Sequence, residues 1–336
     1  MKTMSVFGFA ALVLFQTATI QPNQSFDDNK KMNKYLNGGT LETIQINVSE
    51  GFDTTRSIER DAILLRRPNA IGNVVMCHGY MCDKFDACML RSVLFPRHNV
   101  LSFDFRAHGQ KIDERQCCTF GKDEACEVIA AADYFKNQKE FQELPTGVYG
   151  FSMGAVASIH AQAHRSDLFN YMILDCPFSS TEHVIKTGLD AVKFTVFGYT
   201  FGLPGRDLLK RSIYHPTVQG LVKGFLKTVS HLDATYTNTH IYPLSPAQLV
   251  KKISVPCFFI HCKEDEKVTT AAAYELFSGA RGFKRLWITN GRRHFDSFFY
   301  NPEKYTYKVN HFINNVLQNQ LASKQQQKIF EDPEMG

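Results

Sequence analysis

The sequence predicts an α/β fold in which helices flank a mostly parallel central sheet. The main evidence is alternation along the chain: short runs rich in β-branched residues are followed by longer segments whose apolar residues recur at helical spacing. A second observation is the composition. With 44% hydrophobic and 21% charged residues, the chain has the balance of a globular protein, which excludes a disordered scaffold and a polytopic membrane protein.

The expected elements begin with an antiparallel ribbon over residues 41–65. The strands of the parallel sheet are then expected at residues 71–76, 100–105, 146–149, 171–174, 257–261 and 285–288. The segments between them predict helices at residues 122–135, 153–164, 270–277 and 303–317. Together these elements predict one domain over residues 41–317.

Two segments depart from the alternation. About 75 residues separate Phe178 from Ile253, with helical patches, glycines and prolines but no clear strand, and this is long for a crossover connection. We expect residues 179–252 to form a largely helical cap over the carboxyl edge of the sheet. The polar tail over residues 318–336 is rich in Gln and Lys and is expected to be disordered.

The amino terminus has the layout of a secretory signal peptide. Lys2 precedes an apolar run over residues 4–15 and a short stretch of small polar residues. The run is short for a membrane span, and no clean cleavage site follows it. We therefore expect residues 1–20 to be a signal peptide or an uncleaved anchor, and the protein to be exported or secreted. A cytoplasmic or membrane-anchored protein is the alternative.

The nine cysteines bear on this expectation, because an odd number leaves at least one thiol unpaired in an oxidising compartment. Cys77, Cys176, Cys257 and Cys262 fall in or beside predicted strands and are expected to be buried thiols. No cysteine spacing matches a zinc site, so neither a metal nor another cofactor is expected.

The net charge of +5 is mild, and Lys and Arg are not concentrated in any one stretch. A nucleic-acid partner is therefore not expected. Lys and Arg outnumber Asp and Glu within the expected cap, which leaves weak contact between the cap and a membrane surface open.

Residues 150–154 read Gly-Phe-Ser-Met-Gly, between a predicted strand and a helix of small residues. A serine hydroxyl becomes a good nucleophile only when a neighbouring base takes its proton and fixed donors stabilise the oxyanion. A sharp strand-to-helix turn exposes such a serine, and for steric reasons it requires glycine two residues to either side. Ser152 is therefore the candidate nucleophile, and a structural serine is the alternative.

His294 is the candidate general base, because it lies in a loop directly after the last predicted strand. His261 lies within a predicted strand, and His160 and His164 lie on the helix that follows the candidate serine. These three are weaker candidates. A surface histidine without a catalytic role is the alternative for His294.

A carboxylate must hold the imidazole in the right tautomer and stabilise its protonated form. Asp265 follows the strand before that of His294 and is the candidate, but Glu264 and Glu266 flank it, and the choice among the three depends on pattern alone. Asp175, at the end of an earlier strand, is a further alternative, because some serine hydrolases take their acid from that position. The order along the chain is then serine, acid, histidine.

In this order and in its motifs, the chain resembles the alpha/beta-hydrolase superfamily over roughly residues 64–317. Besides the serine turn, the matching motifs are His78-Gly79 and the segments at residues 104–109 and 174–179. Residues 120–124 and 128–134 resemble the serine-aminopeptidase-like and prolyl-oligopeptidase-like branch. The resemblance implies the alpha/beta-hydrolase fold with a cap insertion, and an oxyanion hole formed by the backbone amides of Tyr80 and Met153.

Two residues depart from the family pattern, since Ala107 and Arg293 stand where the family often has glycine. The change to Ala107 is a mild change in a turn. Arg293 places a cation beside the candidate base, where it selects anionic substrates, lowers the pKa of the histidine, or simply points to solvent.

The expected function is that of a serine hydrolase with a Ser-His-Asp triad, which cleaves a carboxylic ester or thioester through an acyl-enzyme intermediate. Aromatic residues of the expected cap, among them Phe194 and Phe201, favour a small-molecule or lipid-like acyl substrate. A peptidase of the serine-aminopeptidase type is the first alternative, because the branch resemblance implies it. A non-catalytic binding protein on the hydrolase scaffold is the second.

Overall fold

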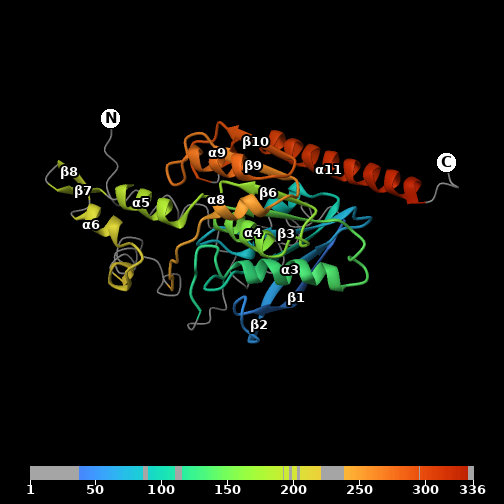
Figure 1. Ribbon diagram of the computed structural model, residues 1–336, viewed down its shortest axis with the longest axis horizontal. Helices are drawn as coiled ribbons and strands as arrows, with labels where there is room; N and C mark the ends of the chain where they lie inside the picture. The colour runs from blue at the N-terminus through green and yellow to red at the C-terminus, as the bar shows by residue number, and fades with distance from the viewer. Residues whose placement is uncertain are drawn as a thin grey trace.

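The computed structural model describes residues 38–85, 90–109, 116–191, 193–196, 199–202, 205–220, 238–294 and 296–331 (Figure 1). The predicted signal segment at residues 1–20 lies outside the described residues. Within the described ranges, no helix combines the length and the apolar character needed to cross a membrane.

An eight-stranded sheet runs through the described part of the chain, in the order β1-β2-β4-β3-β5-β6-β9-β10 (Figure 1). Its strands are β1 (Thr40–Ser49), β2 (Ser57–Arg66), β3 (Gly72–Cys77), β4 (His98–Phe103), β5 (Thr146–Phe151), β6 (Tyr171–Asp175), β9 (Cys257–Cys262) and β10 (Lys284–Thr289). β2 pairs antiparallel with β1 and with β4, and every neighbouring pair from β4 to β10 is parallel. The predicted antiparallel ribbon and mostly parallel sheet are confirmed.

Helices cover both faces of the sheet, as buried parallel strands require. One core contains residues of α3 (Ala125–Asn137), α4 (Met153–His164), α8 (Pro246–Leu249), the 3-10 helix η4 (Val250–Lys252) and α9 (Thr270–Gly279). The other core contains residues of α11 (Pro302–Glu331) and of the 3-10 helix η2 (Leu90–Leu94). The neighbouring residues Val74 and Val75 point into opposite cores, which is why β3 is buried throughout.

The described part of the insertion after β6 contains helices and a hairpin, and it projects from the body as an arm (Figure 1). Its described elements are α5 (Thr181–Ala191), β7 (Lys193–Val196), β8 (Tyr199–Gly202) and α6 (Arg206–Arg211). The sequence pattern predicts helices here, but it does not predict the antiparallel pairing of β7 with β8. The runs Lys-Phe-Thr-Val and Tyr-Thr-Phe-Gly combine β-branched and aromatic residues, which favour strands when they are paired.

The prediction of a disordered tail from residue 318 is wrong for its described part, because α11 continues as a helix to Glu331. The first half of α11 is docked on the sheet through Val309, Phe312 and Val316. A helix that is already nucleated gains a hydrogen bond for each residue it adds, and Gln, Leu, Ala and Lys have high helix propensity. A polar composition therefore does not end this helix.

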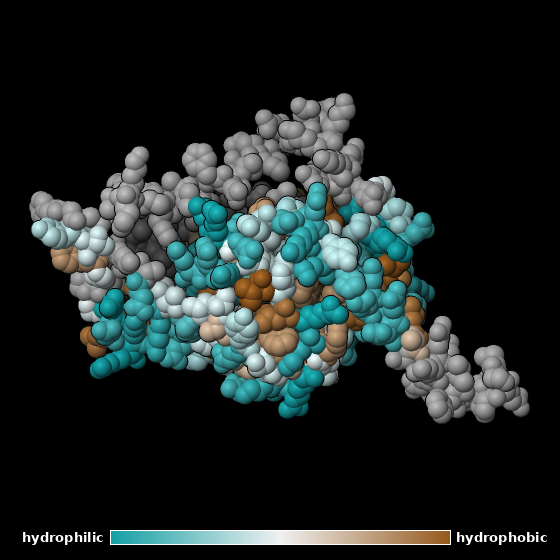
Figure 2. All heavy atoms as spheres, turned by 90° about the horizontal axis from the view of Figure 1, so that it is seen from above, coloured by the Kyte–Doolittle hydropathy of each residue, from teal (hydrophilic) through white to brown (hydrophobic). Residues whose placement is uncertain are grey.

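Seen from above, the described part of the molecule is mostly hydrophilic, and hydrophobic residues reach the surface in small separate groups (Figure 2). Exposed aromatic residues on or beside α9 and α11 include Tyr274, Phe283 and Tyr307. Scattered exposure of this kind is ordinary for a folded chain and needs no functional explanation.

The cysteines of the described residues all carry free thiols. Cys77, Cys176, Cys257 and Cys262 are buried, as predicted, and burial raises the pKa of each thiol. Since the thiolate is the nucleophilic form, these four side chains serve as apolar packing groups.

His98, at the start of β4, is a buried histidine with an unusual environment. Neither of its ring nitrogens has a hydrogen-bond partner among the described residues. Burial, together with the positive charge of Arg97, lowers the pKa of His98 from 6.5 to about 4. In the window between these two values the unfolded chain binds a proton that the folded chain does not bind. Stability is therefore lost as the pH falls through that window.

Replacing His98 by leucine is expected to reduce the loss of unfolding free energy between pH 7 and pH 4 by up to about 3 kcal/mol, because leucine takes up no proton. Urea titrations at a series of pH values measure this loss. The control is His183→Leu, which changes an exposed histidine of α5 and should follow the wild-type curve. Parallel pH dependences of the His98→Leu and wild-type proteins would contradict the expectation.

Candidate active site

Ser152 lies on a sharp turn between β5 and α4. Its φ of 52° is positive, which is a strained conformation for a residue other than glycine. The Ser152 N–H donates to the carbonyl oxygen of Asp175 at 2.8 Å and so holds the turn against β6. A Cβ atom at Gly150 would lie 2.6 Å from the carbonyl oxygen of Gly154, and one at Gly154 would lie 2.2 Å from that of Cys77. Only glycine therefore fits at both positions.

The structure brings the three predicted residues Ser152, Asp265 and His294 together. His294 Nε2 lies 2.9 Å from Ser152 Oγ, and His294 Nδ1 lies 2.6 Å from Asp265 Oδ2. When Nδ1–H donates to the carboxylate, Nε2 is left as the acceptor for the serine hydroxyl. This geometry allows His294 to take up the proton of Ser152.

The carboxylate of Asp265 is held by the turn that carries it. Its Oδ1 atom accepts hydrogen bonds from the backbone N–H groups of Lys267 and Val268, both at 2.9 Å. Burial alone would raise the pKa of Asp265, but the hydrogen bond to His294, the charge of His294 and the Val268 N–H together lower it below its usual value. Asp265 is therefore ionised at neutral pH, with Oδ2 directed at His294.

The alternative acids have other surroundings. Glu264 and Glu266 are exposed, whereas Asp265 is buried between them. Asp175 is buried at the end of β6, where its Oδ2 accepts a hydrogen bond from Tyr305 Oη at 2.8 Å and a longer one from Tyr149 Oη at 3.5 Å. The carboxylate that accepts the short hydrogen bond from His294 belongs to Asp265, the residue that the sequence pattern favours.

The alternative histidines are also placed by their contacts. His261 is buried in β9, and its Nε2 lies 2.8 Å from the carbonyl oxygen of Val268 and 3.6 Å from Asp265 Oδ2. His261 therefore supports the turn that carries Asp265. His160 and His164 pack against the ring of Phe52. The histidine that accepts the hydrogen bond from the Ser152 hydroxyl is His294.

The loop between β10 and α10 (Asp296–Tyr300) carries His294 and is held by residues that the sequence pattern does not predict. Ser297 Oγ lies 3.1 Å from Thr289 Oγ1 and 3.0 Å from Cys262 Sγ, all in a buried position. Gly291 leaves no room for a side chain, since a Cβ atom there would lie 2.7 Å from Cys262 Sγ. The sequence carries no signal for this group, because its members come from three separate elements.

The predicted oxyanion residues, Tyr80 and Met153, lie on the two chain segments that meet at Gly154. A Cβ atom at Gly154 would lie 2.5 Å from the carbonyl oxygen of His78, so the start of α4 packs directly on the segment that leads to Tyr80. His78 braces this segment: its Nδ1–H donates to the Gly79 carbonyl oxygen at 2.8 Å, and its Nε2 accepts from an N–H of the loop after β4 at 3.0 Å. Burial and His108 lower the pKa of His78 to about 3, so the ring is neutral and keeps both bonds.

The two residues that depart from the family pattern, Ala107 and Arg293, have different surroundings. Ala107 is buried and has a φ of 56°, so a glycine would fit this backbone without strain. Arg293 is exposed to solvent.

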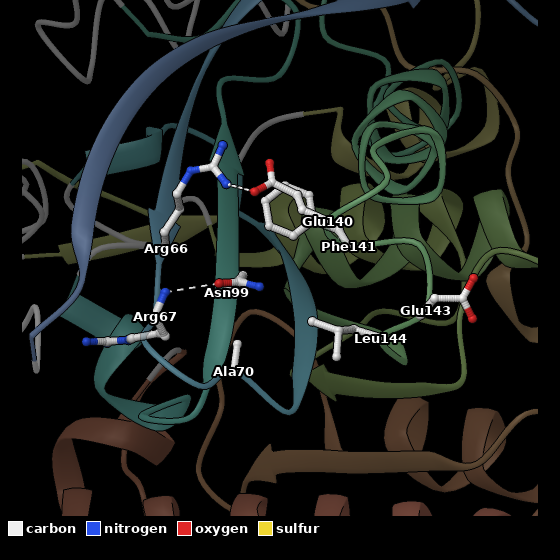
Figure 3. A pocket seen from close by; sticks show the side chains of 8 residues that line it. All are labelled: Arg66, Arg67, Ala70, Asn99, Glu140, Phe141, Glu143 and Leu144. Atoms are coloured by element: carbon white, nitrogen blue, oxygen red, sulfur yellow. Dashed lines mark hydrogen bonds and ion pairs between the residues drawn. The ribbon is translucent and has the colours of Figure 1, made fainter.

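A cavity of about 470 Å³ lies elsewhere in the molecule (Figure 3). Its lining residues are Arg66, Arg67, Ala70, Asn99, Glu140, Phe141, Glu143 and Leu144. Several of them stand at the amino ends of β3, β4 and β5, whereas Ser152 follows the carboxyl end of β5. A strand of this length spans about 20 Å, so the cavity is not the site of the serine. Arg66 in this cavity is already paired with Glu42 and Glu140.

Comparison with solved structures bears directly on the fold. The chain superposes on the Pyrococcus furiosus esterase Pf2001 with a TM-score of 0.61, at 19% identity, over 85% of this chain and 94% of that one. For the peroxisomal alpha-beta-hydrolase Lpx1 of Saccharomyces cerevisiae, the TM-score is 0.55 at 14% identity, over 84% of this chain and 90% of the other. This chain has the alpha/beta-hydrolase fold. The fold implied by the resemblance is confirmed.

The alpha/beta-hydrolase fold of this chain also matches Pyrococcus horikoshii acylaminoacyl peptidase, with a TM-score of 0.53 at 15% identity, over 82% of this chain and 41% of that longer one. Among curated proteins, the chain is 28% identical over 251 residues to the uncharacterized protein YqkD of Bacillus subtilis, covering 74% of this chain and 72% of the relative. No family model matches the chain. The structural neighbours thus include both esterases and a peptidase.

Proposed function

We propose that this alpha/beta-hydrolase is a serine hydrolase that cleaves carboxylic esters or thioesters through an acyl-enzyme intermediate. The observation that carries the proposal is the chain of hydrogen bonds from Ser152 through His294 to Asp265. Such a chain activates a serine that is otherwise a weak nucleophile. The strained turn that presents the serine and the ionised state of Asp265 support the same role.

In the proposed mechanism, Ser152 Oγ attacks the acyl carbon while His294 Nε2 takes its proton. The carbonyl oxygen becomes an oxyanion, which the backbone N–H groups of Tyr80 and Met153 stabilise. When the tetrahedral intermediate collapses, the bond to the alcohol or thiol breaks and His294 returns the proton to that leaving group. Water then attacks the acyl-serine, again with His294 as base, and releases the carboxylic acid and the free serine.

Aromatic residues beside the serine turn support an apolar acyl group. The ring of Phe120 lies 4.7 Å from that of Tyr80 and 6.5 Å from that of Phe178, measured between centroids. The next residue, Gly121, is in close contact with Val156 of α4, which places this aromatic cluster beside the nucleophile helix. An apolar lining with few polar groups is typical of a pocket for a hydrophobic chain.

A substrate panel tests the proposal. We expect purified protein to hydrolyse p-nitrophenyl esters, with kcat/KM rising by roughly fifteenfold for each two carbons added to a short acyl chain, because burial of each methylene group contributes about 0.8 kcal/mol. Aminoacyl and acylaminoacyl amides in the same panel test the peptidase alternative, which the similarity to an acylaminoacyl peptidase keeps open. A higher kcat/KM for the amides than for every ester would overturn the ester assignment.

A further inference from the structure

We propose that Thr239 and Cys118 are positioning residues that hold the two oxyanion-hole residues and thereby couple the insertion to the catalytic centre. The inference rests on the proposed function, since it assigns a role within that oxyanion hole. Its starting point is an isolated parallel bridge between Cys118 and Thr239. One partner precedes α3, and the other lies where the chain returns from the insertion to the body.

The bridge is made by the backbone. The Cys118 N–H donates to the carbonyl oxygen of Asn238 at 2.9 Å, and the His240 N–H donates to the carbonyl oxygen of Cys118 at 2.8 Å. The side-chain amide of Asn238 adds a hydrogen bond to the carbonyl oxygen of Gln116. The returning chain is therefore fixed in register against residues 116–118.

The body side of this bridge is itself held firmly. The buried carboxylate of Glu124 accepts hydrogen bonds from the N–H groups of Thr119 at 2.6 Å and Gly121 at 2.7 Å. The Thr119 hydroxyl also donates a hydrogen bond to this carboxylate, at 2.7 Å. Because these hydrogen bonds fix the loop around Cys118, a displacement of the insertion is transmitted to the bridge between Cys118 and Thr239 and is not absorbed by movement of the loop.

The first contact from the bridge reaches Tyr80. Tyr80 Oη lies 3.1 Å from Thr239 Oγ1, and the tyrosine ring packs against those of Phe120 and His108. Burial raises the pKa of Tyr80 to about 12, so the hydroxyl stays protonated and the hydrogen bond persists at any working pH. The Tyr80 side chain is therefore held at its hydroxyl and along its ring, and we infer that this restricts the direction of the Tyr80 N–H.

The second contact reaches Met153. The thiol of Cys118 lies 3.4 Å from Met153 Sδ, and both side chains are buried. Met153 is the first residue of α4 and directly follows the strained Ser152. The single bridge between Cys118 and Thr239 thus touches the side chains of both residues whose amides would hold the oxyanion. Because such amides act only within a narrow range of distance and angle, a shift of the bridge lowers the rate of the chemical step.

Side-chain substitutions that remove one contact and keep the shape test this inference. Since loss of a whole oxyanion donor costs about 10²- to 10³-fold in kcat, a misdirected donor should cost about tenfold. We expect that loss in kcat for Tyr80→Phe and for Thr239→Val, with KM changed by less than about twofold. The double variant should be no slower than either single variant, because both remove the same hydrogen bond. Cys118→Ala should lower kcat in the same way through Met153.

Inhibition by a trifluoromethyl ketone tests the oxyanion hole directly. A purely structural role of Tyr80 and Thr239 would leave its inhibition constant unchanged. Ser152 Oγ adds to the ketone carbon, and the resulting alkoxide occupies the oxyanion hole, so its inhibition constant should rise by the same factor of about ten in Tyr80→Phe and Thr239→Val. The matched control is Tyr214→Phe. It removes another Tyr–Thr hydrogen bond, 3.0 Å long between Tyr214 Oη and Thr181 Oγ1, within the insertion. Its kcat and inhibition constant should equal those of the wild type.

Wild-type kcat and ketone inhibition in both Tyr80→Phe and Thr239→Val would overturn the role of Thr239, while the hydrolase function would stand. A wild-type kcat in Cys118→Ala would overturn the role of Cys118. An equal loss in Tyr214→Phe would show general loosening of the insertion and would also overturn the proposal. A wild-type protein that hydrolyses no substrate of the panel would overturn the proposed function, and this inference with it.

Discussion

Replacing Ser152 by alanine is expected to lower kcat for ester hydrolysis by about 10⁵- to 10⁶-fold and to abolish covalent labelling by a fluorophosphonate. Alanine removes the only atom that forms the acyl-enzyme bond, and His294 Nε2 then has no hydroxyl at 2.9 Å from which to take a proton. Alanine also fits the volume of the turn, so the fold should persist. Steady-state kinetics and mass spectrometry of the labelled protein measure the two effects.

The matched control is Ser92→Ala, since Ser92 is a fully buried serine on η2, outside the candidate site. It should label at the wild-type rate. Equal labelling of wild-type and Ser152→Ala proteins would show that another residue reacts with the probe, and the assignment of Ser152 as nucleophile would be wrong.

Replacing Asp265 by asparagine is expected to lower kcat by about 10⁴-fold, as loss of the triad carboxylate does in serine proteases. The reason lies in the turn that holds the side chain. The N–H groups of Lys267 and Val268 both donate to Oδ1, so the oxygen of asparagine must occupy that position. The amide NH₂ group is then directed at His294 Nδ1 and forces the tautomer that carries its proton on Nε2. In that tautomer the histidine cannot accept the proton of Ser152.

The comparison variant is Asp175→Asn. An asparagine oxygen can still accept the hydrogen bond from Tyr305, so this variant should retain kcat within about tenfold and lose mainly stability. Kinetics of the two variants, measured beside thermal unfolding, separate the carboxylates. Near-wild-type activity of Asp265→Asn together with a large kcat loss in Asp175→Asn would transfer the role of the acid to Asp175.

Most of the sheet was predictable because its strands have recognisable local sequence patterns. Strands buried on both faces give continuous apolar runs, and for this reason β5 and β9 lie within two residues of their predicted bounds. The hairpin of β7 and β8 was not predictable, because four-residue strands carry too short a pattern to show a period. The extent of α11 was also not predictable from its polar tail, because the tail becomes helical by extending the half that docks on the sheet.

The sequence by itself determined that a serine would stand on a strained turn. Gly150 and Gly154 are required by contacts of the turn with itself and with β3, so a pentapeptide between a strand and a helix contains most of the information. The same holds for His294, whose place after a strand of a parallel sheet puts it at the edge where Ser152 lies.

Only the tertiary structure decided which carboxylate meets His294. Glu264, Asp265 and Glu266 are neighbours with similar chemistry, and the choice depends on the turn after β9, whose N–H groups bind Asp265 and leave the glutamates in solvent. The contact of Tyr80 with Thr239 is a still clearer case, because 159 positions separate the two residues. No local pattern encodes a pair whose partners meet only when the insertion returns to the sheet.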